Sequence, residues 1–363
     1  MDYMEQALSL AKLALGEVSP NPAVGAVVVK EGVVVGQGYT QPPGSWHAEV
    51  IALKQAGEAA RQGTLYVSLE PCSHYGRTPP CTELVKAAGI VELHLAMLDP
   101  NPLVSGRGKD ELEKEGIKVY LGEHEEEAQR LNEAYTKFVT TGMPFVTAKF
   151  AMSLDGKIAT KTGDSQWITG SEARKYVHGL RYTADAIMAG VNTVLVDDPH
   201  LTCRCGGKGG TAKKQPLRVI VDGKGRTPIT AQIFHEPGKT LVTLGRSATP
   251  EEEKAFTEVG AELLELPLSE GRIDLRSLLE KLGERGITSV LVEGGGTLLG
   301  SLFDANLIAR VIAFIAPIII GGEKAKPAVG GQGVDRVVDS LRLKDVSLEE
   351  FGGDFVISGY VKE

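Results

Sequence analysis

Short runs of β-branched residues alternate with amphipathic segments along this chain, and the alternation stops at Gly142-Met143-Pro144 before it begins again. Strand and helix in alternation indicate a sheet whose two faces are covered by helices. A Gly and a Pro close together are typical of a linker. The chain has 363 residues, which at about 150 residues per domain suggests two domains. We therefore predict an α/β protein with domains at 1–143 and 144–363.

The first half shows the clearer pattern. Apolar residues at Met4, Leu8, Ala11 and Leu15 have helical spacing, and Pro20 ends that helix. Two β-branched runs, 24–29 and 33–35, flank Glu31-Gly32 and predict a hairpin. Helices are then expected at 46–54, 81–88, 108–115 and 128–140, and strands at 65–68, 92–97 and 118–121.

The second half repeats the alternation. We expect strands at 145–151, 186–190, 218–221, 240–243 and 289–292, and helices at 171–182, 191–196, 251–259, 275–283 and 298–303. The segments 309–320 and 355–362 are rich in β-formers and lack helical periodicity. They predict antiparallel edge strands, and hence a mixed sheet.

Charge and composition exclude several classes of protein. The net charge is −8 and no basic block is present, which argues against a nucleic-acid-binding protein. The longest apolar run, 311–320, is too short to cross a bilayer, and the N-terminus lacks a basic segment. Four cysteines are too few for a disulfide scaffold, so we expect reduced thiols or metal ligands and a cytoplasmic protein without a membrane partner.

One imidazole and two thiols point to a catalytic zinc site. His47, Cys72 and Cys81 would leave the fourth position of a tetrahedral zinc ion open, as a zinc that activates water requires. Glu49 follows His47 by two residues and is placed to move protons without binding the metal. Each residue taken singly is more simply explained by packing, but the His-x-Glu and two Pro-Cys motifs together predict a zinc-dependent deaminase.

Eight residues separate the two cysteines, where the deaminase pattern has two. The inserted loop carries His74, Tyr75 and Arg77, and it is either a lid that contacts a phosphate or a solvated turn. Prolines flank Asn21 and Asn101, and Asp99 ends a strand. Their amides and carboxylate match the polar edge of a pyrimidine, although two ordinary proline turns would explain the same pattern equally well.

A glycine-rich turn follows the strand at 289–292, at Glu293-Gly294-Gly295-Gly296-Thr297, and opens a helix. Such a turn suits a dinucleotide pyrophosphate, because the backbone can approach closely and the helix N-terminus favours an anion. The spacing is not Gly-x-Gly-x-x-Gly, and no acidic residue ends a strand about 20 positions later. A Rossmann domain is therefore disfavoured, and a purely structural turn remains an alternative.

These motifs resemble the bifunctional riboflavin biosynthesis proteins, which join a diaminohydroxyphosphoribosylaminopyrimidine deaminase to a 5-amino-6-(5-phosphoribosylamino)uracil reductase. The resemblance extends over nearly the whole chain, and it is carried by Asn21-Pro22-x-Val24-Gly25, His47-Ala48-Glu49, 70–81, Asp99-Pro100-Asn101-Pro102, 149–157, 165–169 and 197–204. It implies a cytidine-deaminase-like three-layer α/β/α domain followed by a dihydrofolate-reductase-like α/β domain. It also implies Zn²⁺ and NADPH as cofactors, and a phosphorylated pyrimidine as the substrate.

The resemblance assigns roles to individual residues. His47, Cys72 and Cys81 become zinc ligands, and Glu49 becomes the proton donor and acceptor. Contacts to NADPH are implied for Ala151, Trp167, Thr193, Asp197, Gly295, Gly296, Thr297, Leu298, Leu299, Gly300 and Ser301. Contacts to the reductase substrate are implied for Ser165, Arg181, Leu201, Arg204 and Glu293, with Lys149 as a further polar candidate. Lys149 and Asp197 are both candidates for a polar or proton-transfer role, and the sequence does not assign the acid between them.

Several alternatives stay open at this point. Arg181 and Arg204 can hold a ribose phosphate, or each can form a surface ion pair. Cys203 and Cys205 lack a nearby third ligand in the sequence, so we interpret their spacing as chance. A nucleic-acid base deaminase, and a nucleotide sensor with a structural zinc, are the rival functions. A homo-oligomer, either a dimer or a tetramer, is expected from the family alone.

Overall fold

The computed structural model describes residues 2–75, 79–102, 104–205, 212 and 214–362. The chain forms two compact units, Met1–Met143 and Pro144–Glu363. In the part of the chain that is described, no helix has the length and apolarity needed to cross a membrane.

The first unit contains one five-stranded sheet in the order β2-β1-β3-β4-β5. β1 pairs antiparallel with both β2 and β3, whereas β3, β4 and β5 run parallel. The predicted hairpin is confirmed, with Glu31 and Gly32 both at positive φ in its turn. The strands are β1 (Gly25–Lys30), β2 (Val33–Tyr39), β3 (Thr64–Val67), β4 (Glu92–Leu95) and β5 (Lys118–Leu121).

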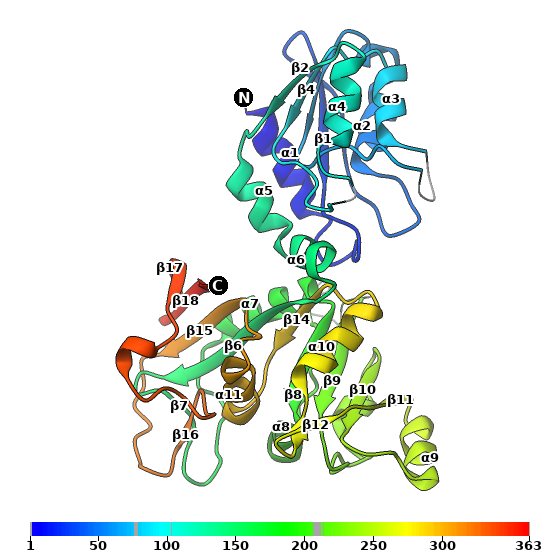
Figure 1. Cartoon of the computed structure of the whole chain (residues 1–363). Helices are drawn as coiled ribbons and strands as arrows, with labels where there is room; N and C mark the ends of the chain where they lie inside the picture. The colour runs from blue at the N-terminus through cyan, green and yellow to red at the C-terminus, as the bar shows by residue number, and fades with distance from the viewer. Residues whose placement is uncertain (1, 76–78, 103, 206–211, 213, 363) are drawn as a thin grey trace. The chain divides into compact units, whose positions relative to one another are not determined.

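Helices cover both faces of this sheet (Figure 1). Contacts link α2, α3 and α4 on one face, and α1 and α5 on the other. Two glycines permit this close packing, because a Cβ at Gly25 would meet the backbone of Ala7 in α1, and one at Gly36 would meet Ala52 in α2. The helices are α1 (Tyr3–Lys12), α2 (Ala48–Ala56), α3 (Cys81–Ala87), α4 (Arg107–Lys114), α5 (Glu125–Leu131) and α6 (Glu133–Thr141), with a 3-10 turn at Gly57–Ala60.

The prediction of one continuous helix at 128–140 is wrong, because the structure contains two helices, α5 and α6, that are separated at Asn132. The Asn132 side chain is buried and pairs with the backbone of Ala23: its Oδ1 accepts from the N–H at 2.9 Å and its Nδ2 donates to the C=O at 3.2 Å. This pairing ties the break between the helices to the segment that carries Asn21.

The second unit is built on a nine-stranded sheet in the order β11-β10-β9-β8-β14-β6-β15-β18-β17. In this order the strands from β11 to β15 are parallel, and β18 and β17 are antiparallel additions at one edge, so the predicted mixed sheet is confirmed. The prediction of an antiparallel edge strand at 309–320 is wrong: this segment forms β15, a mostly buried strand inside the sheet that runs parallel to β6. The segment at 355–362 forms the antiparallel strand β18. The main strands are β6 (Phe145–Ser153), β8 (Ala186–Gly190), β9 (Leu217–Val221), β10 (Thr240–Leu244), β11 (Ala261–Glu265), β14 (Ser289–Val292), β15 (Arg310–Ala316), β17 (Leu343–Phe351) and β18 (Asp354–Val361).

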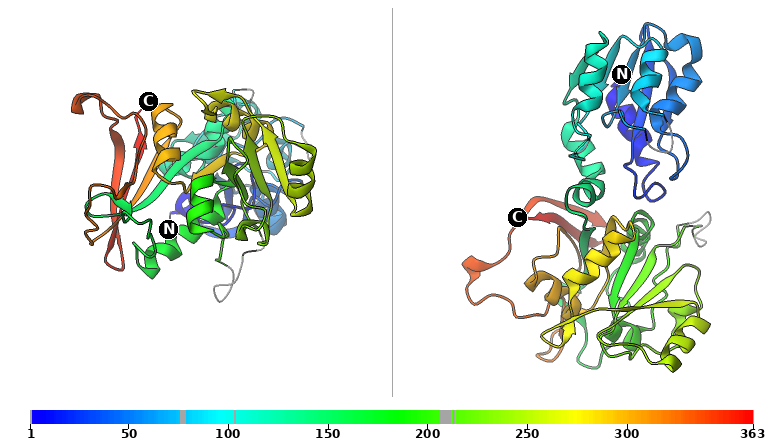
Figure 2. Two further views of the ribbon diagram at one scale, coloured as in Figure 1. Left: turned by 90° about the horizontal axis from the view of Figure 1, so that it is seen from below. Right: turned by 45° about the vertical axis from the view of Figure 1, so that its right-hand side comes forward.

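Helices again lie on both faces, as Figures 1 and 2 show. α7 packs its buried Ala173 and Val177 against Ile312 and Phe314 of β15, and α10 and α11 lie on the opposite face. The capping box of Thr249 and Glu252 starts α9. The helices are α7 (Ser171–Thr183), α8 (Val191–Asp197), α9 (Pro250–Glu258), α10 (Leu275–Glu284) and α11 (Gly296–Asp304), with 3-10 turns at Gln232–Phe234 and Val337–Asp339.

The sequence analysis did not predict several strands of this unit. β11 and β17 are edge strands, and β17 is exposed along most of its length, so neither carries the apolar run of a buried strand. The other four form two small antiparallel sheets of two strands each. β7 (Lys157–Ala159) pairs with the distant β16 (Lys326–Pro327), and β12 (Leu268–Ser269) forms a hairpin with β13 (Arg272–Ile273).

Candidate functional site

Three potential metal ligands converge at one end of the sheet in the first unit. His47 is the N-cap residue of α2, Cys81 is the first residue of α3, and Cys72 lies in the connection between β3 and α3. The positive end of a helix dipole favours a thiolate. The two helix starts and the end of β3 therefore bring together side chains that lie up to 34 residues apart in the sequence.

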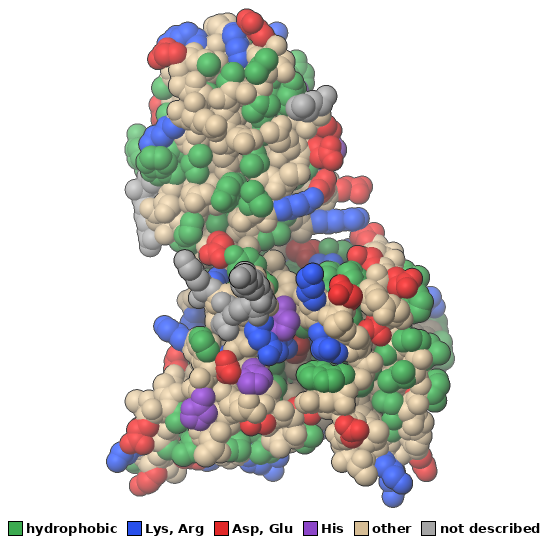
Figure 3. All heavy atoms as spheres, turned by 180° about the vertical axis from the view of Figure 1, so that it is seen from behind, with side chains coloured by type: hydrophobic (Ala, Val, Ile, Leu, Met, Phe, Trp, Pro, Cys, Tyr) green, Lys and Arg blue, Asp and Glu red, His purple; other side chains and the backbone are tan. Residues whose placement is uncertain are grey.

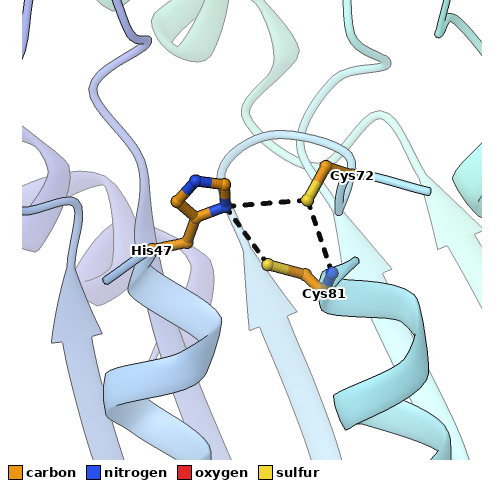
Figure 4. Close-up of side chains that lie close together, drawn as sticks. All are labelled: His47, Cys72 and Cys81. Carbon is orange, nitrogen blue, oxygen red and sulfur yellow. Dashed lines mark hydrogen bonds between the residues drawn. The ribbon is translucent and has the colours of Figure 1, made fainter. Parts of the chain in front are cut away.

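The three side chains point toward one another (Figure 4). The His47 Nδ1 atom lies 3.3 Å from Cys81 Sγ and 3.6 Å from Cys72 Sγ, and the backbone N–H of Cys81 donates to Cys72 Sγ at 3.4 Å. All three ligand atoms lie within 4.8 Å of one another. One imidazole and two thiols at this separation fit a zinc ion that binds at about 2.0–2.3 Å from each ligand atom.

The electrostatics suit a metal site. Hydrogen bonding from Cys81, followed by that of His47, lowers the pKa of the Cys72 thiol to about 4. Glu49 is 4% exposed, and burial raises the pKa of its carboxyl to about 7, with the Cys72 charge adding to the effect. A carboxyl near that pKa can both accept and donate protons at neutral pH.

A cavity of about 450 Å³ opens beside the metal ligands, and it is larger than a cavity of about 250 Å³ in the second unit. The larger cavity is lined by His47, Glu49 and Cys72, and also by the predicted substrate residues Asn21, His74, Asp99 and Asn101. The structure thus brings these residues together. Arg77 lies outside the described residues.

Two residues of this site were missed by the sequence analysis. Tyr135 of α6 lines the cavity and donates from its hydroxyl to Asp99 Oδ1 at 3.1 Å. Glu70 is 4% exposed, and its carboxylate accepts from the backbone N–H groups of Asp99, Gly106 and Lys109. Glu70 was visible only as part of a family motif, and a tyrosine in an amphipathic helix carries no local signal of function.

A buried ion cluster lies in the second unit, at the carboxyl end of β14. The Glu293 carboxylate forms ion pairs with two cations: its Oε1 lies 2.6 Å from Arg181 Nε, and its Oε2 lies 3.4 Å from Lys149 Nζ. Burial opposes ionisation, yet the charges of Arg181 and Lys149 lower the pKa of the Glu293 carboxyl to about 2. Burial lowers the pKa of Lys149. Three of the predicted substrate residues therefore form one charged group.

The remaining predicted substrate residues are distributed around this cluster. Ser165 donates to Asp197 Oδ1 at 2.9 Å, which links a predicted substrate contact to a predicted cofactor contact. Arg204 is exposed, and its backbone N–H donates to His178 Nδ1 at 3.2 Å. The side chain of Leu201 is 4% exposed and packs in a core cluster with Ile187, so only its backbone is available to a ligand.

Lys, Arg and His side chains gather around a hollow on one face of the second unit (Figure 3).

Cys203 and Cys205, whose spacing we interpreted as chance, have their sulfur atoms 2.7 Å apart. Both thiols are free. Burial raises the pKa of the Cys203 thiol to about 12, which makes it a poor nucleophile at neutral pH.

The smaller cavity lies beside the glycine-rich turn of the second unit. Of the predicted cofactor residues, Thr193, Gly295, Thr297, Leu298 and Ser301 line it. Leu299 is fully buried, and a Cβ at Gly300 would meet the backbone of Gly330, so these two residues serve packing. A Cβ at Gly296 would meet the backbone of Pro327.

Two further predicted cofactor residues lie away from that cavity lining. Ala151 is in β6, opposite Phe314 of β15. Trp167 is 69% exposed, with the Arg174 guanidinium 4.7 Å from the centre of its ring. The indole of Trp167 is therefore open to a ligand, as is the cavity beside the glycine-rich turn.

Comparisons with known proteins agree with this division of the chain. A sequence model described as the cytidine and deoxycytidylate deaminase zinc-binding region matches residues 1–97. A second, described as the RibD C-terminal domain, matches residues 144–357.

Curated relatives match over nearly the full length. The riboflavin biosynthesis protein RibD of Aquifex aeolicus is 44% identical, with 98% of this chain and 97% of the relative covered. RibD of Escherichia coli is 39% identical, with 97% and 96% covered.

Solved structures match as closely. Acinetobacter baumannii RibD superposes with a TM-score of 0.89 at 38% identity, covering 99% of this chain and 98% of that one. A Thermotoga maritima diaminohydroxyphosphoribosylaminopyrimidine deaminase/5-amino-6-(5-phosphoribosylamino)uracil reductase gives a TM-score of 0.86 at 36% identity, with 99% and 98% covered. The chain therefore belongs to the RibD family of bifunctional riboflavin biosynthesis enzymes, in which a zinc-dependent deaminase is joined to an NADPH-dependent reductase.

Proposed function

We propose that residues 1–143 form the deaminase domain, which converts 2,5-diamino-6-ribosylamino-4(3H)-pyrimidinone 5′-phosphate into 5-amino-6-(5-phosphoribosylamino)uracil. Residues 144–363 form the reductase domain, which reduces the ribosyl chain of that product to ribityl. The observation that carries the proposal is the cavity in which the His47, Cys72 and Glu49 side chains meet Asn21 and Asp99.

In the deaminase site, His47, Cys72 and Cys81 would hold the zinc ion. The chemistry that zinc supplies when bound is acidification of a water molecule. Glu49 takes a proton from that water and delivers protons to the departing amino group, so that water enters and ammonia leaves. Its burial beside the ligands keeps the carboxyl close to both proton positions.

The polar cavity lining orients the pyrimidine. Asn21 and Asn101 offer amide donors and acceptors, and Asp99 offers a carboxylate that Tyr135 holds in place. His74 extends the lining on the loop between the two cysteines. We assign Arg77 of the same loop to the substrate phosphate.

In the reductase site, the chemistry that NADPH supplies is a hydride for C1 of the ribosyl chain. As the C1–O bond of the ribose ring opens, the released oxygen requires one proton. Lys149 is the candidate donor, because its ammonium lies in the ion cluster with Glu293 and Arg181. Arg181 and Arg204 hold the ribose phosphate, with Ser165 and the backbone of Leu201 beside them.

NADPH contacts are assigned to Ala151, Trp167, Thr193, Asp197 and the turn at 295–301. The glycine turn and the start of α11 suit the pyrophosphate, because backbone N–H groups at a helix N-terminus favour an anion.

We also propose that the protein is a homo-oligomer that acts in the cytoplasm. Val346 and Leu348 of the edge strand β17 are 58% and 66% exposed, and apolar side chains on an edge strand favour pairing with a second copy. Light scattering coupled to size-exclusion chromatography tests the oligomeric state directly, and a monomer at micromolar concentration contradicts it.

Mass spectrometry of the products tests the two reactions. The zinc-loaded protein is incubated with the diaminopyrimidinone ribosylamino phosphate, once without NADPH and once with it. We expect the deaminated product in the first tube and the ribitylamino product in the second. Unchanged substrate in both tubes contradicts the whole proposal, and deamination alone contradicts the reductase assignment.

A further inference from the structure

We propose that Lys224 and Arg226, which follow β9, recognise the 2′-phosphate of NADPH and so select NADPH over NADH. The inference rests on the proposed reductase function, and it extends that function to two residues that neither the motifs nor the glycine turn identified. Both residues line the cavity of about 250 Å³ that also contains Thr193, Gly295 and Ser301.

The order of the strands gives the dinucleotide a direction. β9, β8 and β14 are adjacent and parallel, so the residues that follow them lie in a row along one edge of the sheet. The glycine turn follows β14, Thr193 lies at the start of α8 after β8, and Lys224 follows β9. The substrate cluster includes Lys149 of β6, which pairs with β14 on the side away from β8. The nicotinamide end must face the substrate, and the adenosine end therefore extends toward β9.

The described residues that line the cavity contribute only positive charge. Among the described residues that line it, the ionisable side chains are Lys224, Arg226 and Arg272. Lys224 and Arg226 are exposed and form no ion pair with any other described residue. Two cations without a carboxylate partner, in a cavity that a dinucleotide occupies, fit a phosphate with two negative charges.

The carboxylate that could favour NADH, Asp222, is already hydrogen-bonded within its own turn. NAD-dependent enzymes often use an acidic residue after a strand to bind the ribose 2′-hydroxyl, and Asp222 stands at that position after β9. Its side chain is fully buried, and it accepts from the Lys224 N–H and from the N–H and hydroxyl of Thr227. Asp222 therefore shapes the turn that carries Lys224 and Arg226, and it does not face the cavity.

Arg272 lines the same cavity but lies beside α11, so it can be compared with Lys224 and Arg226. Its Nη1 donates to the Ser301 hydroxyl of α11 at 3.1 Å, on the side of the cavity where the pyrophosphate is assigned. Loss of Arg272 should weaken both dinucleotides, because NADPH and NADH share the pyrophosphate. Loss of Lys224 or Arg226 should weaken only the dinucleotide that has the 2′-phosphate.

Isothermal titration calorimetry on the full-length protein tests this division. Variants Lys224→Ala, Arg226→Ala, Arg272→Ala and the remote control Lys254→Ala are titrated with NADPH, NADH, 2′,5′-ADP and 5′-ADP. We expect Lys224→Ala and Arg226→Ala each to raise the Kd for NADPH and 2′,5′-ADP by roughly tenfold, with NADH and 5′-ADP unchanged. Arg272→Ala should raise the Kd for NADPH and NADH alike, and Lys254→Ala should change neither.

The contrary results are distinct. Equal losses for NADPH and NADH in Lys224→Ala and Arg226→Ala, or no loss in either variant, overturn the assignment of the 2′-phosphate. A loss confined to NADPH in Arg272→Ala transfers the role to Arg272 and overturns it as well. A wild-type protein that binds neither dinucleotide refutes the cofactor assignment itself, and with it the proposed reductase function.

Discussion

At the scale of single residues, chemistry in this protein depends on ionisable groups that the fold removes from water. Glu49 and Glu293 are both carboxyl groups in buried sites, yet their pKa values move in opposite directions. Burial beside the thiols raises the pKa of Glu49 to about 7, whereas two cations overcome burial and lower that of Glu293 to about 2. The neighbours of each carboxyl therefore decide its use, proton transfer for one and permanent charge for the other.

Replacement of Glu49 by Gln should stop deamination without removing zinc. The amide keeps the size of the side chain but cannot accept a proton, and general acid–base catalysis of this kind contributes about 10²–10⁴-fold. Ammonia release should fall by at least about 10²-fold, while zinc content, measured by mass spectrometry of the metal, stays at the wild-type level. Glu58→Gln, at an exposed carboxylate of the same unit, is the matched control. A Glu49→Gln protein with normal ammonia release would remove Glu49 from the mechanism.

The ion cluster at Glu293 predicts a dependence of stability on pH. The folded-state pKa is about 2 and the ordinary value is 4.5, so the stabilisation by Glu293 is fully present above pH 4.5 and is lost as the pH falls toward 2. The shift corresponds to a contribution on the order of 3 kcal/mol. Urea unfolding followed by Trp167 fluorescence, in a Trp46→Phe background, should show Glu293→Gln to be less stable than the parent protein at pH 7.

Urea unfolding of the same two proteins at pH 3 tests whether the stabilisation falls with pH as expected. The difference between parent and Glu293→Gln should shrink at pH 3, because part of the Glu293 stabilisation has already been lost from the parent. A difference that stays constant between pH 7 and pH 3 would show that the carboxylate charge is not what stabilises the cluster.

At the scale of elements, helix starts and strand ends determine where functional side chains meet. The ends of β3, α2 and α3 assemble the metal ligands, and the break between α5 and α6 aligns Tyr135 with Asp99. That break depends on Asn132, which takes up both backbone groups of Ala23. The end of one helix therefore supports a loop on the other side of the deaminase cavity.

Asn132→Leu should destabilise the first unit and weaken substrate binding. The substitution leaves the buried N–H and C=O of Ala23 without their partner, at about 1–3 kcal/mol for each group left unsatisfied. Urea unfolding followed by Trp46 fluorescence measures the stability, and the KM for deamination should rise because Asn21 loses its support. Gln129→Leu, at an exposed position of α5, should change neither quantity, and a similar effect in both variants would contradict the role of Asn132.

At the scale of the whole molecule, the chain divides into two units with separate cores and separate sites. All three metal ligands lie in the first unit, and the ion cluster and the glycine turn lie in the second. Loss of zinc should therefore affect one reaction and leave the other intact.

Removal of zinc by a chelator tests this separation. Dialysis against a chelator should abolish ammonia release, and added Zn²⁺ should restore it. Oxidation of NADPH with 5-amino-6-(5-phosphoribosylamino)uracil should continue at the wild-type rate in the zinc-free protein. Cys72→Ser should reproduce the first effect irreversibly. Loss of both activities on chelation would show that the second unit depends on the metal site.

Much of this organisation could be predicted from the sequence, because local patterns specify local structure. The alternation of apolar runs identifies most helices and the buried strands, and the residue types at 47, 49, 72 and 81 indicate a zinc deaminase from the sequence alone. The strands that escaped prediction are edge strands or members of small two-stranded sheets. These strands are short or largely exposed, and they therefore lack the long apolar pattern on which such predictions rest.

Only the tertiary structure decided which distant residues share a site. Lys149 and Glu293 are separated by 144 residues, and Arg181 and Glu293 by 112, yet they form one buried ion cluster. Tyr135 reaches Asp99, and Lys224 and Arg226 line the same cavity as the glycine turn. These contacts depend on the order of the strands in each sheet. That order is set by the packing of whole layers, which no short segment of the sequence contains.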